Sequence, residues 1–415
     1  MTFPSLARRL NLADTVVIGL SAMIGAGVFA VFGPAAQAAG SWLLLGLVVA
    51  MVVALANATS SVQLAASYPT SGGTYVYGRA QLGHWWGFAA GWCFVIGKSA
   101  SCAAMALTFA AYTVPEPWQR PVAAVATLGL TAVGYRGVTR TVQLARVIVA
   151  VVLAAIVVAL AGALLGGTPG LPSVQGAAAG TPQWYGVAQS AGLLFFAFAG
   201  YARVATLGEE VRDPERTIPR GIVLSLAAVA VLYAAVAVTV LATLGPQGTA
   251  ASEAPLADAV AAGSWRWAEP VVRLGAAVAS LGALLALVAG VSRTVLAMAR
   301  ERDLPGWLAA VHPRFRVPHR AEVVLAVVVV TLVLTMDLRG AIGFSSFGVL
   351  LYYAVANAAA FTQGAAHRRY PRALQALGVA GCTGLAATLP PTSVLAGLAV
   401  LGAGLTGRAV VRARR

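Results

Sequence analysis

The sequence predicts an all-helical membrane protein that crosses the bilayer many times. Its composition is the first observation: of 415 residues, 59% are hydrophobic and only 10% are charged, whereas a soluble chain carries about 25% charged residues. The mean hydropathy of +0.82 agrees. The second observation is a series of apolar stretches, most of them near the roughly 20 residues that a helix needs to cross a bilayer. The net charge of +15 is therefore expected to mark topology and lipid contact rather than nucleic-acid binding.

Twelve apolar stretches are candidate transmembrane helices, and the fourth, ninth and eleventh are short. They are 14–37, 42–66, 84–112, 119–135, 143–166, 185–208, 219–244, 270–298, 322–336, 341–363, 373–389 and 392–408. The connection at 67–83 is an arginine-rich loop. The one at 245–269 contains two prolines and is expected to hold a short surface helix.

The arginines give the orientation. Most of them fall in alternate loops, and few lie on the other side: Arg120, Arg266, Arg273 and Arg339. Because positive residues accumulate on the cytoplasmic side, both termini are predicted to be cytoplasmic in a multi-pass protein of the plasma membrane. No small-residue cleavage site follows the first apolar run, so this run is expected to be retained as a span.

No enzymatic or metal-binding pattern is present. The cysteines Cys93, Cys102 and Cys382 lie in apolar runs at no metal-ligand spacing, which favours a packing role. Zinc-protease, serine-hydrolase and P-loop motifs are all missing. We therefore expect no catalysis, no cofactor and no metal.

A pair of glycines marks the first span. Residues 21–29 read SAMIGAGVF, with Gly25 and Gly27 separated by one alanine. Each glycine costs a helix interior roughly 1 kcal/mol relative to alanine, so the helix can unwind there. Unwound backbone in a membrane is tolerated where it faces protein or water, and its free N–H and C=O groups can bind the two charges of an amino acid. The alternative is a close helix contact through small residues.

A second interruption is predicted in the sixth span, where residues 195–201 read FFAFAGY. Breaks in the first and sixth spans are typical of two inverted five-helix repeats. The repeats would be residues 1–166 and 185–363, within a single transporter domain of residues 1–415. Residues 373–415 would form two accessory helices and a basic tail.

Four stretches carry a resemblance to a known family. They are GLSAMIGAGVF at 19–29, YPTSGGTYVYGRAQLG at 68–83, FFAFAGYARVATLGEEVRDPERTIPRGI at 195–222 and SRTVLAMARERDLPGWLAAVHPRF at 292–315. In order and spacing the chain resembles the amino acid–polyamine–organocation permease superfamily. That resemblance implies a LeuT-like fold of five-plus-five inverted repeats with broken helices 1 and 6, and secondary transport of amino acids or related amines.

The resemblance also implies where a substrate would bind. In relatives, backbone N–H groups matching those of Ala26 and Gly27 hold the carboxylate, and carbonyls matching Met23 and Ala199 face the amino group. Phe196 matches an aromatic residue that closes over substrate, although simple packing is the alternative for it. The full set of implied substrate-site residues is Met23, Ile24, Gly25, Ala26, Gly27, Phe196, Ala199 and Gly200.

The chain departs from the family's pattern at charged positions. Many relatives have an acidic residue where this chain has Ala202, and a glutamate where it has Gln63. Proton-coupled relatives carry a lysine in the fifth span. That position falls near Ala150, among apolar residues, and the nearest basic residue is Arg146. Proton coupling through the fifth span is therefore in doubt.

Two basic residues inside spans are candidates for coupling or gating. Lys98 is the only lysine and lies in the middle of the third span. A buried lysine changes protonation readily, so we hypothesise that Lys98 carries the driving proton; the alternative is a fixed cation bound to carbonyls. Arg203 keeps its charge and could pair with Glu209, Glu210 or a substrate carboxylate. With no acidic residue deep in any span, a cationic substrate would be repelled, so a neutral amino acid fits best and an acidic one stays open.

The predicted function is secondary transport of an amino acid, coupled to protons or working by exchange. The alternatives are a channel-like facilitator and a sensor of the same fold that moves nothing. The charged run after the sixth span could act as a gate through ion pairs with Arg79 or Arg140. Substrate identity, coupling ion, direction and oligomeric state are not fixed by the sequence.

Overall fold

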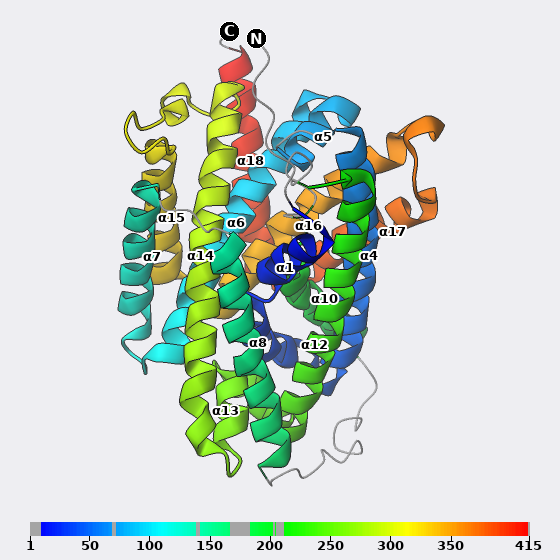
Figure 1. Ribbon diagram of the computed structural model, residues 1–415. Helices are drawn as coiled ribbons and strands as arrows, with labels where there is room; N and C mark the ends of the chain where they lie inside the picture. The colour runs from blue at the N-terminus through cyan, green and yellow to red at the C-terminus, as the bar shows by residue number, and fades with distance from the viewer. Residues whose placement is uncertain are drawn as a thin grey trace.

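The computed structural model describes residues 10–68, 72–137, 142–166, 183–201, 204 and 211–413. These residues form a bundle of α-helices (Figure 1). The described residues contain no β-strand, only a single bridge between Leu10 and Val211. The prediction of an all-helical protein is thereby confirmed.

The helices follow the predicted spans closely. Their bounds are α1 (Leu12–Met23), α2 (Gly27–Ala30), α3 (Phe32–Ala39), α4 (Leu43–Ser67), α5 (Thr74–Leu82), α6 (His84–Thr113), α7 (Gln119–Tyr135), α8 (Val142–Leu165), α10 (Trp184–Phe198), α12 (Pro214–Ala251), α13 (Pro255–Ala261), α14 (Glu269–Arg300), α15 (His319–Thr335), α16 (Leu338–Thr362), α17 (Arg372–Thr388) and α18 (Pro391–Ala413). In the described part of the chain, 8 helical segments are long and apolar enough to cross a membrane. The four other predicted spans correspond to the shorter helices α7, α10, α15 and α17.

The start of α1 shows how local sequence sets a boundary. Asn11 and Asp14 form a capping box, in which each side chain accepts a hydrogen bond from the other residue's backbone N–H. Such a box satisfies N–H groups that have no partner inside the helix. The buried Asp14 carboxylate also forms an ion pair with Arg146 of α8. This pair ties the beginning of α1 to its neighbour.

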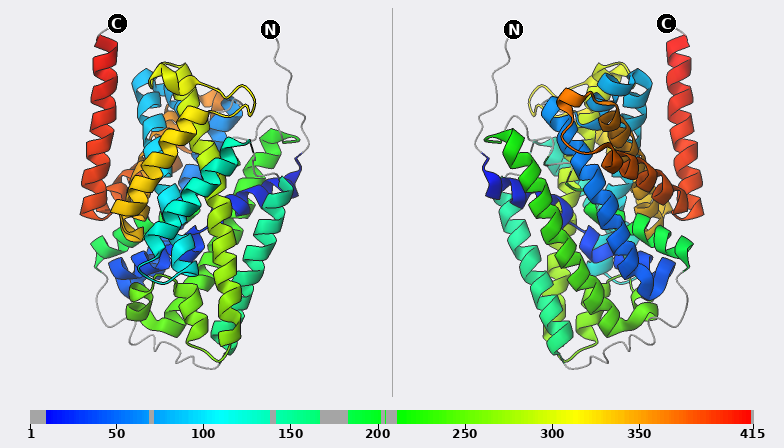
Figure 2. Two further views of the ribbon diagram at one scale, coloured as in Figure 1. Left: turned by 90° about the vertical axis from the view of Figure 1, so that its left-hand side faces the viewer. Right: turned by 90° about the vertical axis from the view of Figure 1, so that its right-hand side faces the viewer.

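The two interrupted segments lie inside the bundle. α1 packs against α12 and α8, and α10 packs against α3, α4 and α16. The long helix α6 packs against α14 and α16. By contrast, α18 stands at the margin of the bundle (Figure 2). The centre of the molecule is therefore built from the two interrupted segments and the long helices around them.

Two short helices differ from the sequence-based expectations. The connection at 245–269 does hold a helix, α13, but it is not a surface helix: Leu256, Ala257 and Val260 are buried, and it packs against α8, α12 and α14. The connection at 67–83, predicted as a loop, contains α5, which packs against α6 and α16. Both are short and are stabilised by tertiary contacts, which a hydropathy pattern does not register.

Candidate substrate site

The first span is interrupted between α1 and α2, inside the glycine-containing stretch. Residues 24–26 are not helical, and the last backbone bond of α1 joins the N–H of Ile24 to the carbonyl of Leu20 at 2.7 Å. Within the described chain, no backbone hydrogen bond is donated by the N–H groups of Gly25, Ala26 and Gly27. These residues are buried. The break therefore presents backbone donors that are free to bind an acceptor.

The second interruption follows α10. This helix ends at Phe198, and residues 199–201 form a turn. Beyond this turn, the N–H of Val204 donates to the carbonyl of Tyr201 at 2.9 Å. Ala202 and Arg203 lie outside the described residues, as do Glu209 and Glu210. The predicted role of Arg203 therefore stays a prediction.

The two breaks lie against each other, backbone to backbone. A Cβ added to Gly200 would lie 2.2 Å from the carbonyl oxygen of Ala22. A Cβ added to Gly27 would lie 3.0 Å from the Cα of Ala197. A side chain at Gly200 would clash with the backbone of the last turn of α1, just before the first break. The glycines thus allow the unwound segments of the first and sixth spans to touch.

Two buried tyrosines donate to carbonyl groups at the breaks. The hydroxyl of Tyr233, on α12, lies 2.7 Å from the carbonyl oxygen of Met23 and 3.1 Å from that of Ala197. The hydroxyl of Tyr353, on α16, donates to the carbonyl of Ala199 at 3.2 Å. A carbonyl oxygen has two lone pairs, so those of Met23 and Ala199 can each accept a further hydrogen bond from a ligand.

Phe196 lies on α10, next to these carbonyls in sequence, and is 8% exposed. The two other phenylalanines of the sequence FFAF make edge contacts with tyrosine rings: Phe195 with Tyr353 and Phe198 with Tyr233. No such ring contact is found for Phe196 in the part of the chain that the structure describes. Phe196 packs within the main hydrophobic core, and its predicted role of closing over a substrate stays a prediction.

Lys98 lies on α6 and is partly exposed. Two helical turns before it, on nearly the same face, Gly91 abuts Met298 of α14. One turn before it, Phe94 contacts the ring of Tyr352 on α16. Lys98 therefore projects from the face of α6 that meets α14 and α16. Lys98 makes no hydrogen bond or ion pair with the other residues that the structure covers.

A network of buried amides joins α4, α16 and α17, and the sequence did not indicate it. Asn357 accepts a hydrogen bond from Ser60 and donates one to Asn57, both at 2.6 Å. One turn along, the amide of Gln63 donates to Gln363 at 2.8 Å and its oxygen accepts from the N–H of Arg369 at 3.0 Å. At Gln63, which matches a glutamate of relatives, the chain thus has a neutral group that is fully used in hydrogen bonds.

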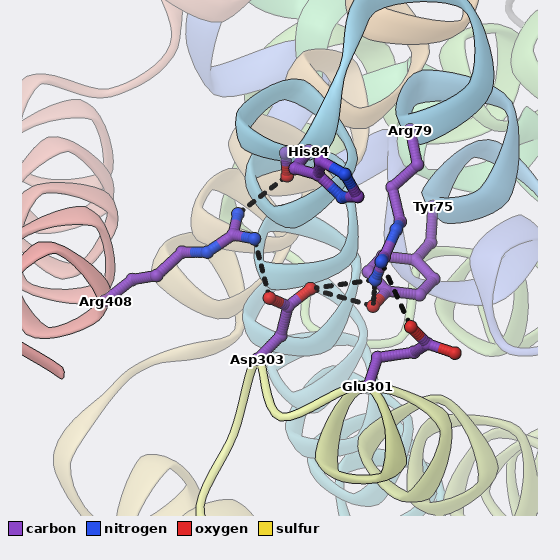
Figure 3. A network of polar contacts seen from close by, with 6 residues as sticks. All are labelled: Tyr75, Arg79, His84, Glu301, Asp303 and Arg408. Atoms are coloured by element: carbon purple, nitrogen blue, oxygen red, sulfur yellow. Dashed lines mark hydrogen bonds and ion pairs between the residues drawn. The ribbon is translucent and has the colours of Figure 1, made fainter. Parts of the chain in front are cut away.

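A cluster of charges lies at the end of the bundle where α5 is found (Figure 3). Asp303, which follows α14, pairs with Arg408 of α18 at 2.6 Å and with Arg79 of α5 at 3.4 Å. Arg79 also pairs with Glu301 at 3.0 Å. The Tyr75 hydroxyl donates to Asp303 at 2.8 Å, and burial raises the pKa of this phenol, so it stays protonated and remains a donor.

This cluster bears on the predicted gate. Arg79 pairs with two residues that follow α14, and Glu209 and Glu210 of the charged run lie outside the described residues, so its predicted pairing with that run stays a prediction. In that run Glu215 pairs with Arg369, and Arg140 lies outside the described residues. The sequence gives only two indications of this cluster. They are a single arginine near the end of the last apolar stretch and a single aspartate in the sequence RERDLP. The tyrosines at the breaks could not be identified from the sequence, because each is an isolated polar group in an apolar span.

Comparison with known proteins gives one family and several relatives. Residues 10–406 match the family model described as amino acid permease. An uncharacterized transporter of Mycobacterium tuberculosis is 58% identical over 98% of this chain and 92% of its own length. The branched-chain amino acid permease BcaP of Bacillus subtilis is 26% identical over 76% of this chain and 72% of its own. The cationic amino acid transporter 7 of Arabidopsis thaliana is 29% identical over 85% of this chain and 65% of its own.

Proposed function

The chain belongs to the amino acid permease family, a family of transporters and not of enzymes, and from this premise we propose that it is a secondary carrier of a neutral amino acid. We extend the proposal to the architecture: twelve spans, with inverted repeats at residues 1–166 and 185–363, broken helices 1 and 6, and accessory helices in residues 373–415. Both termini would lie in the cytoplasm of a plasma-membrane protein.

The observation that supports binding is the pair of facing breaks. The N–H groups of Gly25, Ala26 and Gly27 have no backbone acceptor among the described residues, and a buried donor without a partner costs about 1–3 kcal/mol. A substrate carboxylate would supply the acceptor. The carbonyls of Met23 and Ala199, which already accept from the buried phenols of Tyr233 and Tyr353, would also accept from the substrate ammonium.

The charged groups of the bundle support a substrate with a neutral side chain. The carboxylates of Asp14 and Asp303 are each paired with an arginine. Lys98, on the inner face of α6, has no carboxylate partner among the residues described. A cationic side chain entering that space would meet a like charge in a low dielectric. Among the relatives, this favours a substrate of the branched-chain type over one of the cationic type.

We further propose that Lys98 carries the proton that drives uptake. A lysine can lose its proton, whereas an arginine in its place cannot. Lys98→Arg is therefore expected to keep amino acid exchange and to lose accumulation under an imposed pH gradient, and Lys98→Gln to behave likewise. If Lys98 is only a fixed cation, Lys98→Arg will retain proton-driven accumulation, and that result would overturn the proposal.

The carrier itself is tested by counterflow. The purified protein is placed in liposomes loaded with unlabelled amino acid, and entry of labelled amino acid against its gradient is followed. A carrier gives a transient overshoot. A channel equilibrates the label without overshoot, and a sensor binds the label without moving it, so either outcome would refute the carrier.

A further inference from the structure

One buried phenol contacts both interrupted spans. Tyr233 is 0% exposed, and its hydroxyl oxygen lies 2.7 Å from the carbonyl oxygen of Met23 and 3.1 Å from that of Ala197. Met23 is the last residue of α1, and Ala197 lies in the last turn of α10. Tyr233 itself belongs to a third helix, α12. A single oxygen atom thus joins three elements that are far apart in the sequence.

The two carbonyls cannot both accept the hydroxyl proton of Tyr233. A phenol has one proton to donate, so only one of the two carbonyls can receive it at a time, and the nearer is that of Met23. The second carbonyl, of Ala197, lies within hydrogen-bond distance as an alternative acceptor. Because a buried donor without a partner costs about 1–3 kcal/mol, the hydroxyl is expected to hold at least one of these carbonyls at all times.

We propose that Tyr233 is a positioning residue for the substrate site. By donating to the carbonyl of Met23, with the carbonyl of Ala197 within reach as the alternative acceptor, its hydroxyl sets the separation of the two breaks, and hence the separation between the free N–H groups of the first break and the carbonyls of the second. This inference rests on the proposed function, because it concerns the geometry in which the two ends of an amino acid would be bound.

Ring packing alone does not account for the residue. The ring of Tyr233 makes an edge contact with Phe198 at 5.1 Å between centroids, and a phenylalanine at position 233 would keep that contact. The hydroxyl is the part that reaches the breaks. Tyr233→Phe therefore separates the positioning role from the packing role.

The chain offers a matched control. Tyr77, on α5, is also buried, and its hydroxyl has no hydrogen-bond partner among the described residues. Tyr77→Phe removes the same atom without removing a contact at the breaks. Tyr112→Phe is a second control. It also removes a hydroxyl that donates to a backbone carbonyl, that of Phe29 at 3.0 Å, but this carbonyl lies on α2 beyond the first break.

The experiment measures the dissociation constant of the purified variants for each of the twenty standard L-amino acids, together with exchange rates in liposomes. A lost hydrogen bond of the usual strength corresponds to about a 3- to 10-fold change. Tyr233→Phe is expected to weaken binding of the amino acid that the wild type prefers by about this factor, with Tyr77→Phe unchanged. The dissociation constant is a property of the folded fraction, so a merely structural loss would lower the yield of active protein and leave this constant unchanged.

The outcomes are distinct. Wild-type protein that binds none of the twenty amino acids refutes the proposed function, whatever the variants do. Wild-type protein that binds while Tyr233→Phe binds equally well or more tightly overturns the positioning role alone. If Tyr233→Phe does not fold, 3-fluorotyrosine is placed at position 233. Its more acidic hydroxyl is a stronger donor of unchanged shape, and a dissociation constant identical to that of the wild type would again overturn the inference.

Discussion

The strongest stability prediction concerns the ion pair between Asp303 and Arg408 (Figure 3). The side chain of Arg408 is 3% exposed and that of Asp303 is 5% exposed. Arg408 also donates to the carbonyl of His84 at 2.7 Å and lies 4.5 Å from the ring centroid of Phe88. Because α18 is otherwise at the margin of the bundle (Figure 2), this pair is a main attachment of that helix.

The expected loss of stability depends on which charged groups each substitution leaves without a partner. Removing one partner of a buried ion pair costs about 3–5 kcal/mol. Asp303→Ala removes the anion from Arg408, Arg79 and Tyr75 together, so the full cost is expected. Arg408→Met leaves Asp303 with two donors and refills the volume, so about 1–3 kcal/mol is expected. With an unfolding entropy of about 2.1 cal/mol/K per residue, the melting temperature should fall by about 3–6 °C for Asp303→Ala and about 1–3 °C for Arg408→Met.

The assay is thermal unfolding of the purified protein in detergent, followed by intrinsic fluorescence. Arg412→Met is the control, because Arg412 is exposed one turn further along the same helix and exposed substitutions change stability by about 0.5 kcal/mol or less. The double variant of Asp303 and Arg408 should lose clearly less than the sum of the two single losses, since neither charge is then left unpaired. Equal melting temperatures for Asp303→Ala and Arg412→Met, or strictly additive losses, would refute this account.

Two further predictions concern close contacts and buried amides. Gly200→Ala would place a Cβ 2.2 Å from the carbonyl oxygen of Ala22; we expect loss of amino acid binding in a thermal-shift titration. Gly402→Ala, with no atom within 4 Å of the added Cβ, should leave binding intact, and equal behaviour of the two variants would contradict the geometry. Gln63→Leu strips partners from Gln363 and from backbone N–H groups and should lower stability by about 2–4 kcal/mol, measured by the same thermal unfolding; an unchanged melting temperature would show that the amide network carries no net stability.

The long helices could be predicted from the sequence, because in an apolar medium each segment has to form the hydrogen bonds of its own backbone N–H and C=O groups. The stretch predicted at 119–135 has the same bounds as α7, and the one predicted at 84–112 differs from α6 by one residue. Of the short helices, α5 was not predicted, and α13 was predicted as a surface helix although it is buried. α5 is held by contacts such as that between Gly78 and Gly87, where an added Cβ would lie 3.2 Å from the neighbouring backbone. Such a contact depends on the fold and not on local hydropathy.

The positions of the two helix breaks could be predicted, but not the side-chain contacts that only the tertiary structure forms. The breaks were indicated by a local cost, because the glycines at 25, 27 and 200 each weaken a helix, although Gly97 and Gly348 lie in helices that continue unbroken. Tyr233 and Asp303 act through partners that only the tertiary structure brings close: Met23 on α1 and Arg408 on α18, respectively. A single tyrosine in an apolar span gives no pattern from which its acceptor can be inferred.

The two interpretations of the first glycine pair, close helix contact and substrate binding, can be compared with a second glycine contact in the same molecule. Where α6 crosses α16, a Cβ added to Gly348 would lie 2.8 Å from the Cα of Gly97, which is the close approach that small residues permit between membrane helices. Both helices continue unbroken through that crossing. Gly27 and Gly200 make equally close contacts, yet there the helices stop and the N–H groups of residues 25–27 lose their helical acceptors. Close packing therefore explains why these residues are glycines but not why the helices end there, and the freed backbone groups are those that the proposed substrate would bind.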